Sequence, residues 1–190
     1  MKKLFSFNSR RPDKQFGTGL WRHNRDRFLR AVDRYYATAV AIHDAAGTDP
    51  ASDSEAGAPE TSAQSARGQG TGAPGSAAAS ARETIMAGTH RLNDLASDVD
   101  DLTARLHARW PIDDQVVPGH VRAAVGDSPE LLTRASAKVA EAVLAASMVR
   151  AGTAEGSALT SAAAATERFI TDAADLLDRA REIIAEAERS

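Results

Sequence analysis

The chain of 190 residues contains no cysteine, which excludes disulfide bonds and thiolate metal sites and is typical of a reducing cytoplasm. Hydrophobic residues make up 43% of the chain, many of them alanine, and aromatic residues only 5%, which favours helix-on-helix packing over a β-sandwich. The net charge of -3 conceals a basic head, residues 1–34, which holds ten Lys or Arg against three Asp. The composition predicts an all-α protein of one domain with tails, and its alanine, arginine and aspartate content indicates a GC-rich bacterial genome.

Residues 1–19 have no helical or strand period and contain Pro12, Gly17 and Gly19, so we expect a flexible basic arm. The charged residues Arg10 and Arg11 follow the first aromatics too closely to leave an apolar stretch of the length that a secretion signal needs. No run of eighteen apolar residues occurs anywhere in the chain, so no membrane span is expected. Deleting residues 1–19 is expected to leave the helical content and the melting temperature nearly unchanged.

Residues 20–46 are expected to form the first long helix, because apolar residues recur there at spacings of three and four. This helix is the most aromatic of the chain, and its polar face carries several arginines. Residues 47–79 are rich in Gly, Ala, Ser, Thr and Pro and are expected to form a disordered linker, since they cannot bury enough apolar surface to offset the entropy of ordering.

The stretch from Ser80 to Trp110 carries the clearest pattern of the chain, a heptad seam typical of a coiled coil. Ser80 and Glu83 match a capping box, which predicts that the helix begins there, and Pro111 ends it. We expect Trp110 to close the end of the seam. The seam residues, spaced by three and four, are Leu92, Leu95, Val99, Leu102 and Leu106.

Two further helices are expected after a connector that follows Trp110, one beginning near Ser128 and the other near Ser157. These two helices should be antiparallel because only a short turn separates them. Residues 80–190 and the first helix are therefore predicted to form one four-helix bundle of long amphipathic helices. The direction of the first helix relative to the second is left open by the long linker, and exchange of the first helix between copies, like other self-association, stays open as well.

Catalytic motifs are lacking: the sequence has no nucleophile elbow, no Walker loop and no dinucleotide-binding glycine pattern. His90 and Asp94 lie four residues apart on one helix face, and acidic residues follow them at Asp98, Asp100 and Asp101. A helical metal-dependent hydrolase is therefore an alternative, but a metal site built between helices needs ligands from several helices. We expect no enzyme and no cofactor.

The charge pattern predicts a non-catalytic interaction or scaffold protein of the cytoplasm, or of the inner face of the membrane, that contacts a protein partner through its basic head. Two alternatives use the same residues: the aromatics, among them Phe16, and the cations can bind an anionic membrane surface, or they can stack on bases and neutralise the phosphates of a nucleic acid. The basic head can also be no more than a solubilising tail. The candidate contact residues are Lys2, Lys3, Phe5, Phe7, Arg10, Arg11, Lys14, Arg22, Arg27, Arg30 and Arg34.

Overall fold

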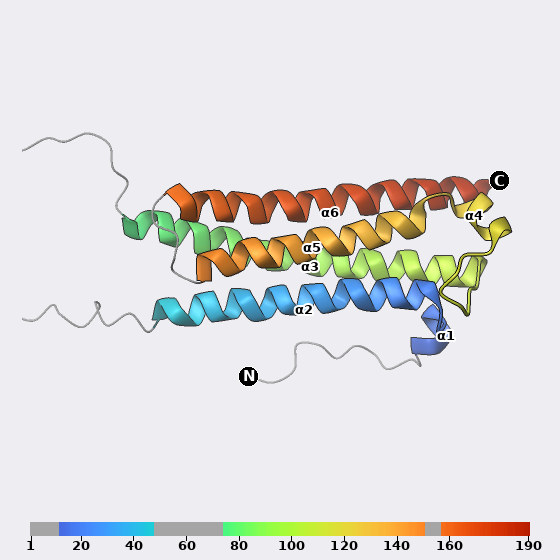
Figure 1. The fold of residues 1–190 in the computed structure, drawn as a ribbon, viewed down its shortest axis with the longest axis horizontal. Helices are drawn as coiled ribbons and strands as arrows, with labels where there is room; N and C mark the ends of the chain where they lie inside the picture. Colours follow the sequence, from blue (N-terminus) through green and yellow to red (C-terminus); the bar gives the residue numbers. More distant parts are fainter. Residues whose placement is uncertain (1–11, 48–73, 151–156) are drawn as a thin grey trace, which may run out of the picture.

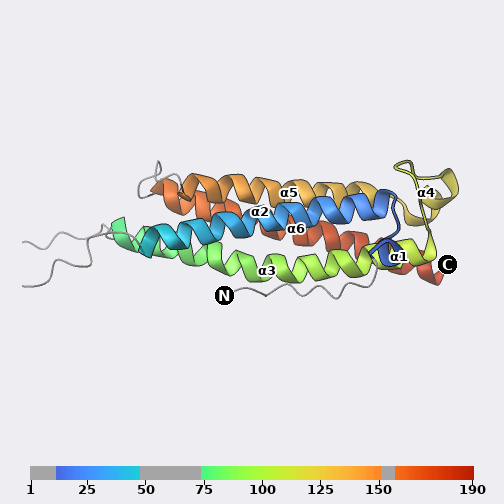
Figure 2. The same ribbon diagram turned by 90° about the horizontal axis from the view of Figure 1, so that it is seen from below.

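A computed structural model describes residues 12–47, 74–150 and 157–190 of the chain (Figure 1). Six helices and no strand occur in these ranges, which confirms the all-α prediction. The four long helices are α2 (Leu20–Gly47), α3 (Pro74–Arg109), α5 (Ser128–Arg150) and α6 (Ser157–Arg189), and they lie side by side (Figure 2). The short helices α1 (Pro12–Phe16) and α4 (Gly119–Val125) lie at one end of the four.

The long helices are arranged around a square rather than in chain order. Helix α2 packs against α3 and α5, and α6 packs against the same two helices, so α2 and α6 lie on one diagonal. Helices α2 and α5 run in one direction, and α3 and α6 run in the opposite direction (Figure 1). The antiparallel pairing expected for the last two helices, α5 and α6, is thus present.

The connector between α3 and α5, residues 110–127, joins helices that stand on the other diagonal of the square and barely touch each other. A short turn can join only adjacent helices. The diagonal step explains why this connector is long and contains α4. It also brings the connector across one end of the helices, where it covers the apolar residues of that end.

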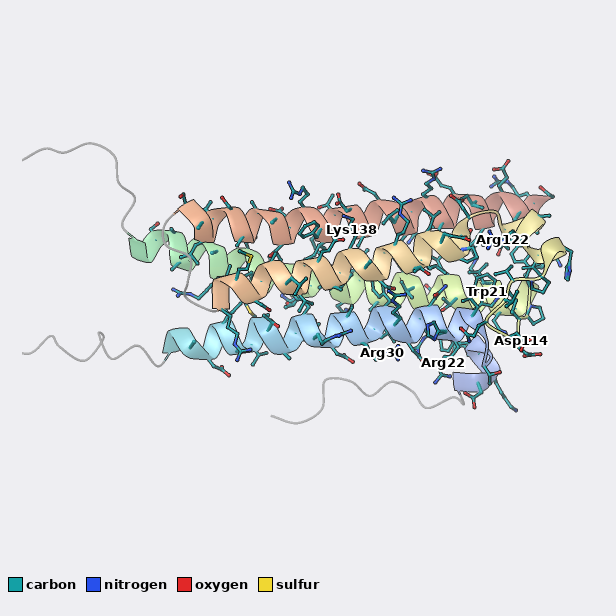
Figure 3. The ribbon with its side chains drawn as sticks, viewed as in Figure 1. Trp21, Arg22, Arg30, Asp114, Arg122 and Lys138 are labelled. Atoms are coloured by element: carbon teal, nitrogen blue, oxygen red, sulfur yellow. The ribbon has the colours of Figure 1, made fainter. Side chains whose placement is uncertain are left out.

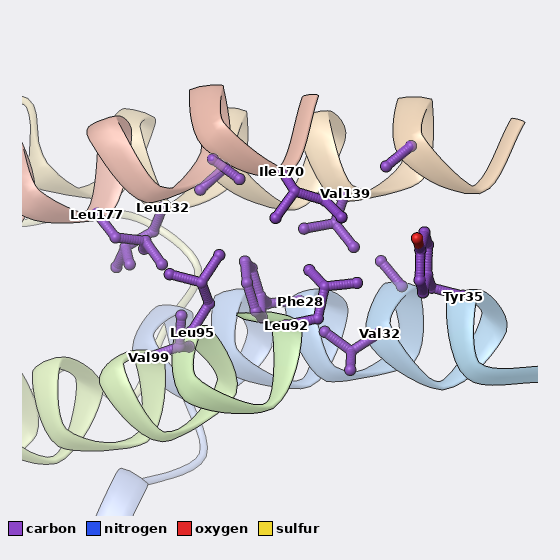
Figure 4. Packing of buried hydrophobic residues seen from close by; sticks show 14 of the residues in the cluster. Phe28, Val32, Tyr35, Leu92, Leu95, Val99, Leu132, Val139, Ile170 and Leu177 are labelled. Atoms are coloured by element: carbon purple, nitrogen blue, oxygen red, sulfur yellow. The ribbon is translucent and has the colours of Figure 1, made fainter. Parts of the chain in front are cut away.

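The interior is filled by apolar residues from all four long helices, and Figure 4 shows side chains of this cluster meeting between them. The heptad prediction is confirmed, because each of its five seam residues is buried. Large core side chains on the other three helices include Phe28, Val32, Tyr35, Leu132, Val139, Ile170 and Leu177.

The end crossed by the connector is closed by tryptophan. The fully buried indole of Trp21 donates a hydrogen bond from Nε1 to the carbonyl oxygen of Trp110, 2.8 Å away. The backbone N–H of Leu20 donates to the carbonyl oxygen of Asp114 at 3.0 Å. These two bonds tie the first turn of α2 to the connector, and Trp110 lies buried at the end of the heptad seam as expected.

The structure corrects the extent of the basic arm, since residues 12–19 are part of the fold. Helix α1 packs against α3 and α2, and the ring of Phe16 is only 4% exposed. Gly17 adopts a φ of 68° and donates its N–H to the carbonyl of Asp13 at 3.0 Å, which closes the helix. Gly19 lies so close to the connector that a Cβ atom there would be 2.1 Å from the carbonyl oxygen of Ile112. The five-residue helix is too short to leave a periodic signal in the sequence.

Helix α3 begins at Pro74, so it includes six residues that were expected to belong to the linker. Ser80 and Glu83 lie inside the helix, and the predicted capping box is therefore wrong. The Ser80 carbonyl accepts a hydrogen bond from the hydroxyl of Thr84 at 3.1 Å. The extension is accounted for by the alanines before and after Ser80, because alanine has the highest helix propensity. Gly47, the first residue of the expected linker, is the last residue of α2, and residues 48–73 lie outside the described residues.

None of the helices in the described part of the chain is both long and apolar enough to cross a bilayer.

Candidate partner-binding surface

The sequence-predicted contact residues fall into three groups in the structure. Lys2, Lys3, Phe5, Phe7, Arg10 and Arg11 lie outside the described residues. Lys14 is exposed on α1, and Arg22 stands where α1 meets α2 (Figure 3). The others, Arg27, Arg30 and Arg34, are exposed along α2.

Arg22 holds α1 against α2. Its Nε atom lies 2.6 Å from an oxygen of Asp26, and its Nη1 atom lies 3.0 Å from an oxygen of Asp13 in α1. The hydrogen bond to Asp26, above all, raises the pKa of the Arg22 guanidinium, so this charge is compensated within the fold. Arg22 is therefore a weaker candidate for contact with a partner than the sequence suggested.

Arg25, which the sequence did not single out, makes the closest polar link between α2 and α3. Its guanidinium donates two hydrogen bonds to the carboxylate of Asp100, at 2.7 and 3.2 Å, and lies 4.1 Å above the ring of Phe16. The side chain is 11% exposed. A planar guanidinium suits both contacts, since it can pair with a carboxylate through two bonds and stack on an aromatic face. No local pattern could reveal this role, because Asp100 is 75 residues away.

Arg27, Arg30 and Arg34 form a single exposed row, called the arginine stripe below. Their spacing of three and four residues puts them on one face of α2, over about 10 Å along the helix axis. None of the three forms an ion pair with a residue of the described ranges. Arg34 donates a hydrogen bond from Nε to the carbonyl oxygen of Arg30 in the same helix, at 3.2 Å. Figure 3 labels Arg30 on this helix.

The buried face of α2 determines where the stripe points. Phe28, Val32 and Tyr35 enter the core from this helix, and the Tyr35 hydroxyl donates to the carbonyl of Ile85 in α3 at 3.0 Å. The stripe lies on the other side of α2 and is held there by this packing. Three guanidinium groups without an ion pair to a described residue outnumber the one exposed carboxylate among them, that of Asp33, so this face of α2 is cationic. Such a face attracts anions and can bind carboxylates through paired hydrogen bonds.

Arg105 of α3 and Arg181 of α6, unlike the stripe arginines, form ion pairs. Arg181 lies 2.8 Å from Asp98 in α3 and also pairs with Asp178, and Arg105 of α3 lies 2.5 Å from Glu188. These pairs link α3 and α6 along their exposed edges. Other arginines, such as Arg82, Arg179 and Arg189, also form no ion pair with a described residue, but they are far apart in the sequence. The arginine stripe is distinguished by three such arginines in one row on one helix face.

Comparison of the chain with protein-family models, with curated proteins and with solved structures finds no match.

The residues considered for a metal-dependent hydrolase are not assembled into a site. His90 and Asp94 are exposed on α3, Asp98 pairs with Arg181, and Asp100 pairs with Arg25. Within residues 12–47, 74–150 and 157–190, no group of three or more His, Asp or Glu side chains is placed to hold a metal ion.

The alternative of a lipid surface loses one of its residues. Phe16, which was expected to enter the interface of a membrane with the other aromatics of the arm, is buried beneath Arg25. Within the described residues, the candidate surface is therefore cationic and not amphipathic.

Proposed function

We propose that the protein is a four-helix bundle that acts without catalysis as an interaction scaffold, and that it binds an acidic protein partner through the arginine stripe. The observation that carries the proposal is that Arg27, Arg30 and Arg34 stand in one exposed row on α2 without an ion pair to a described residue. A cytoplasmic location belongs to the same proposal and is supported by the cysteine-free composition.

Electrostatics favour such a surface for recognition. Exposed cations gain little from isolated surface pairs, but a fixed row of them raises the association rate with an acidic partner and sets its orientation. At physiological salt the screening length is about 8 Å, so adjacent members of the stripe act on the same patch of a partner. Binding should weaken as the salt concentration rises.

The head of the chain can add to the same contact. Four Lys or Arg occur among the eleven residues before α1, and an extended segment of that length reaches about 40 Å at most. The stripe begins about 10 Å from the start of α2. One partner can therefore contact both groups of cations.

The test is affinity capture from a lysate of the source cell, followed by mass spectrometry. Three forms of the tagged full-length protein are compared: wild type, Arg27→Gln/Arg30→Gln/Arg34→Gln, and a control with Arg82→Gln/Arg179→Gln/Arg189→Gln. Both triple variants lose three positive charges, but the control residues lie on α3 and α6, away from the stripe, and form no ion pair with a residue that the structure describes. The proposal predicts an acidic protein that is captured by the wild type and the control and lost from the stripe variant.

Nuclease and detergent treatments separate the other possibilities. Capture that nuclease abolishes would favour the nucleic-acid alternative, and capture that detergent abolishes would favour the anionic-membrane alternative. Equal losses in both triple variants would show that only net charge matters and would contradict a role for the stripe.

A further inference from the structure

A groove opens between α5 and α6 on the outer surface, about 720 Å³ in volume, and we call it the α5–α6 groove. Two exposed apolar side chains of α5 stand at it: Leu144 is 68% exposed and Met148 is 59% exposed. The wall formed by α6 consists mainly of small residues, namely Ser157, Ala158, Ser161, Ala162 and Ala165, with Phe169 at one end. An exposed ridge of large residues and a hollow lined by small residues thus share one face.

Charge is missing from the helix segments that form the groove. No Asp, Glu, Lys or Arg occurs in residues 142–149 or 157–166. Among the described residues that line the groove, only Glu141 is charged. Its carboxylate lies 2.9 Å from Nζ of Lys138, and the same Nζ atom lies 3.5 Å from the carboxylate of Asp172 in α6 (Figure 3). A second copy would therefore meet little like charge at residues 142–149 and 157–166. Lys138, Glu141 and Asp172 neutralise one another at the end of the groove where Phe169 lies.

We infer that the α5–α6 groove is the interface of a symmetric homodimer, in which the Leu144–Met148 ridge of each copy enters the groove of the other. A twofold interface requires a surface that complements itself. This face meets that requirement because it presents both the ridge and the hollow. The small residues of α6 also let a neighbouring helix approach closely, as interdigitating helix packing requires.

The whole outer face of the α5–α6 pair is large enough for such a dimer. It is about 35 Å long, from the 23 residues of α5, and about 20 Å wide for two adjacent helices, so its area of about 700 Å² lies within the roughly 600–1,000 Å² that each partner buries in a standard interface. The apolar groove occupies part of this area, and the ion-paired residues Lys138, Glu141 and Asp172 belong to its polar part. Because α2 is not part of this face, both copies keep their arginine stripes exposed, and one dimer presents two of them.

The experiment measures the oligomeric state of the full chain by sedimentation over a range of protein concentrations. Leu144→Glu is compared with Val40→Glu, which introduces the same charge at an apolar residue that is 51% exposed on α2. The wild type and Val40→Glu should be dimers, and Leu144→Glu should raise the dissociation constant on the order of a hundredfold, since each dimer loses two buried leucines and gains two charges. Both positions are exposed in the monomer, so both variants should keep the wild-type helical content and melting behaviour.

A second measurement tests the symmetry. Because the chain has no natural cysteine, Leu144→Cys and Val40→Cys each carry a single thiol, and a short bis-maleimide can join two copies only where the thiols meet. The inference predicts covalent dimers from Leu144→Cys alone. It is overturned if the wild type is a monomer at every concentration, if Leu144→Glu leaves the dimer intact, or if the Val40→Cys protein is cross-linked as efficiently as the Leu144→Cys protein.

Discussion

Gly88 of α3 leaves room for Tyr35 of α2 and Ile170 of α6 to pack against its backbone, and replacing it with alanine tests that packing. A Cβ atom at this position would lie 2.4 Å from the Tyr35 hydroxyl oxygen and 2.9 Å from Cδ1 of Ile170. Both neighbours are buried, and the hydroxyl donates to the carbonyl of Ile85, so neither can move freely. Overpacking of this kind costs about 1–3 kcal/mol, while alanine in place of glycine favours the helix by about 1 kcal/mol. The net expected loss of unfolding free energy is about 1 kcal/mol.

Gly75→Ala is the matched control, since it lies in the same helix and its Cβ would meet nothing within 4 Å. It should be neutral or stabilising by up to about 1 kcal/mol. Urea unfolding followed by circular dichroism gives both free energies, and the melting temperature of Gly88→Ala should fall by about 2–4 °C. Adding Tyr35→Phe removes the nearest atom, so the cost of Gly88→Ala should shrink in that background. A Gly88→Ala protein as stable as Gly75→Ala would refute the account of this contact.

Three other predictions follow from single contacts. Arg25→Lys should lower the free energy of unfolding, measured in urea, by about 1–2 kcal/mol, because lysine cannot keep both the paired hydrogen bonds to Asp100 and the stacking on Phe16. As a control, the same change at a stripe arginine should alter the free energy of unfolding by less than about 0.5 kcal/mol. Deletion of residues 1–11 should leave the melting temperature unchanged, whereas deletion of residues 1–19 should lower it, because α1 packs on α2 and α3. Equal melting temperatures of the two deletion variants would contradict that packing. Burial raises the pKa of Tyr35 from its ordinary 10.0. Above pH 10 the tyrosine ionises in the unfolded chain but not in the fold, so the free energy of unfolding falls as the pH rises. Tyr35→Phe should reduce this alkaline loss in unfolding measurements between pH 9 and pH 11, about one unit either side of the ordinary pKa.

The parts of the fold that the sequence predicts correctly are those with a long apolar period. The five heptad residues of α3 and the start of α2 at Leu20 were identified because a helix that buries one face must repeat its apolar residues every three or four positions. Helix α1 could not be identified this way. Its order depends on one buried ring, Phe16, and on the guanidinium of Arg25 above it, and both partners are distant in the sequence from the α3 residues they contact.

The order of the helices around the square could not be predicted from the sequence either. The residues that separate α2 from α3, and α3 from α5, are numerous enough to join either adjacent or diagonal helices, so the amphipathic patterns fit several arrangements. The candidate surface was predicted in part. Arg27, Arg30 and Arg34 were among the predicted contact residues, and so was Arg22, which the fold pairs with two aspartates. The stronger pair, with Asp26 four residues away in the same helix, could have been read from the sequence, whereas the pair with Asp13 depends on the docking of α1.

Site-specific photo-crosslinking in the source cell tests the central claim most directly. Ala37 is exposed one turn beyond Arg34 on α2, and Ala164 is exposed on α6. A photoreactive phenylalanine analogue in place of Ala37 should form a covalent adduct with one acidic protein, the same group in place of Ala164 should not, and Arg27→Gln/Arg30→Gln/Arg34→Gln should abolish the adduct at Ala37. An Ala37 adduct that persists in that triple variant, or the absence of any protein adduct at Ala37, would contradict the proposal that the arginine stripe binds a partner.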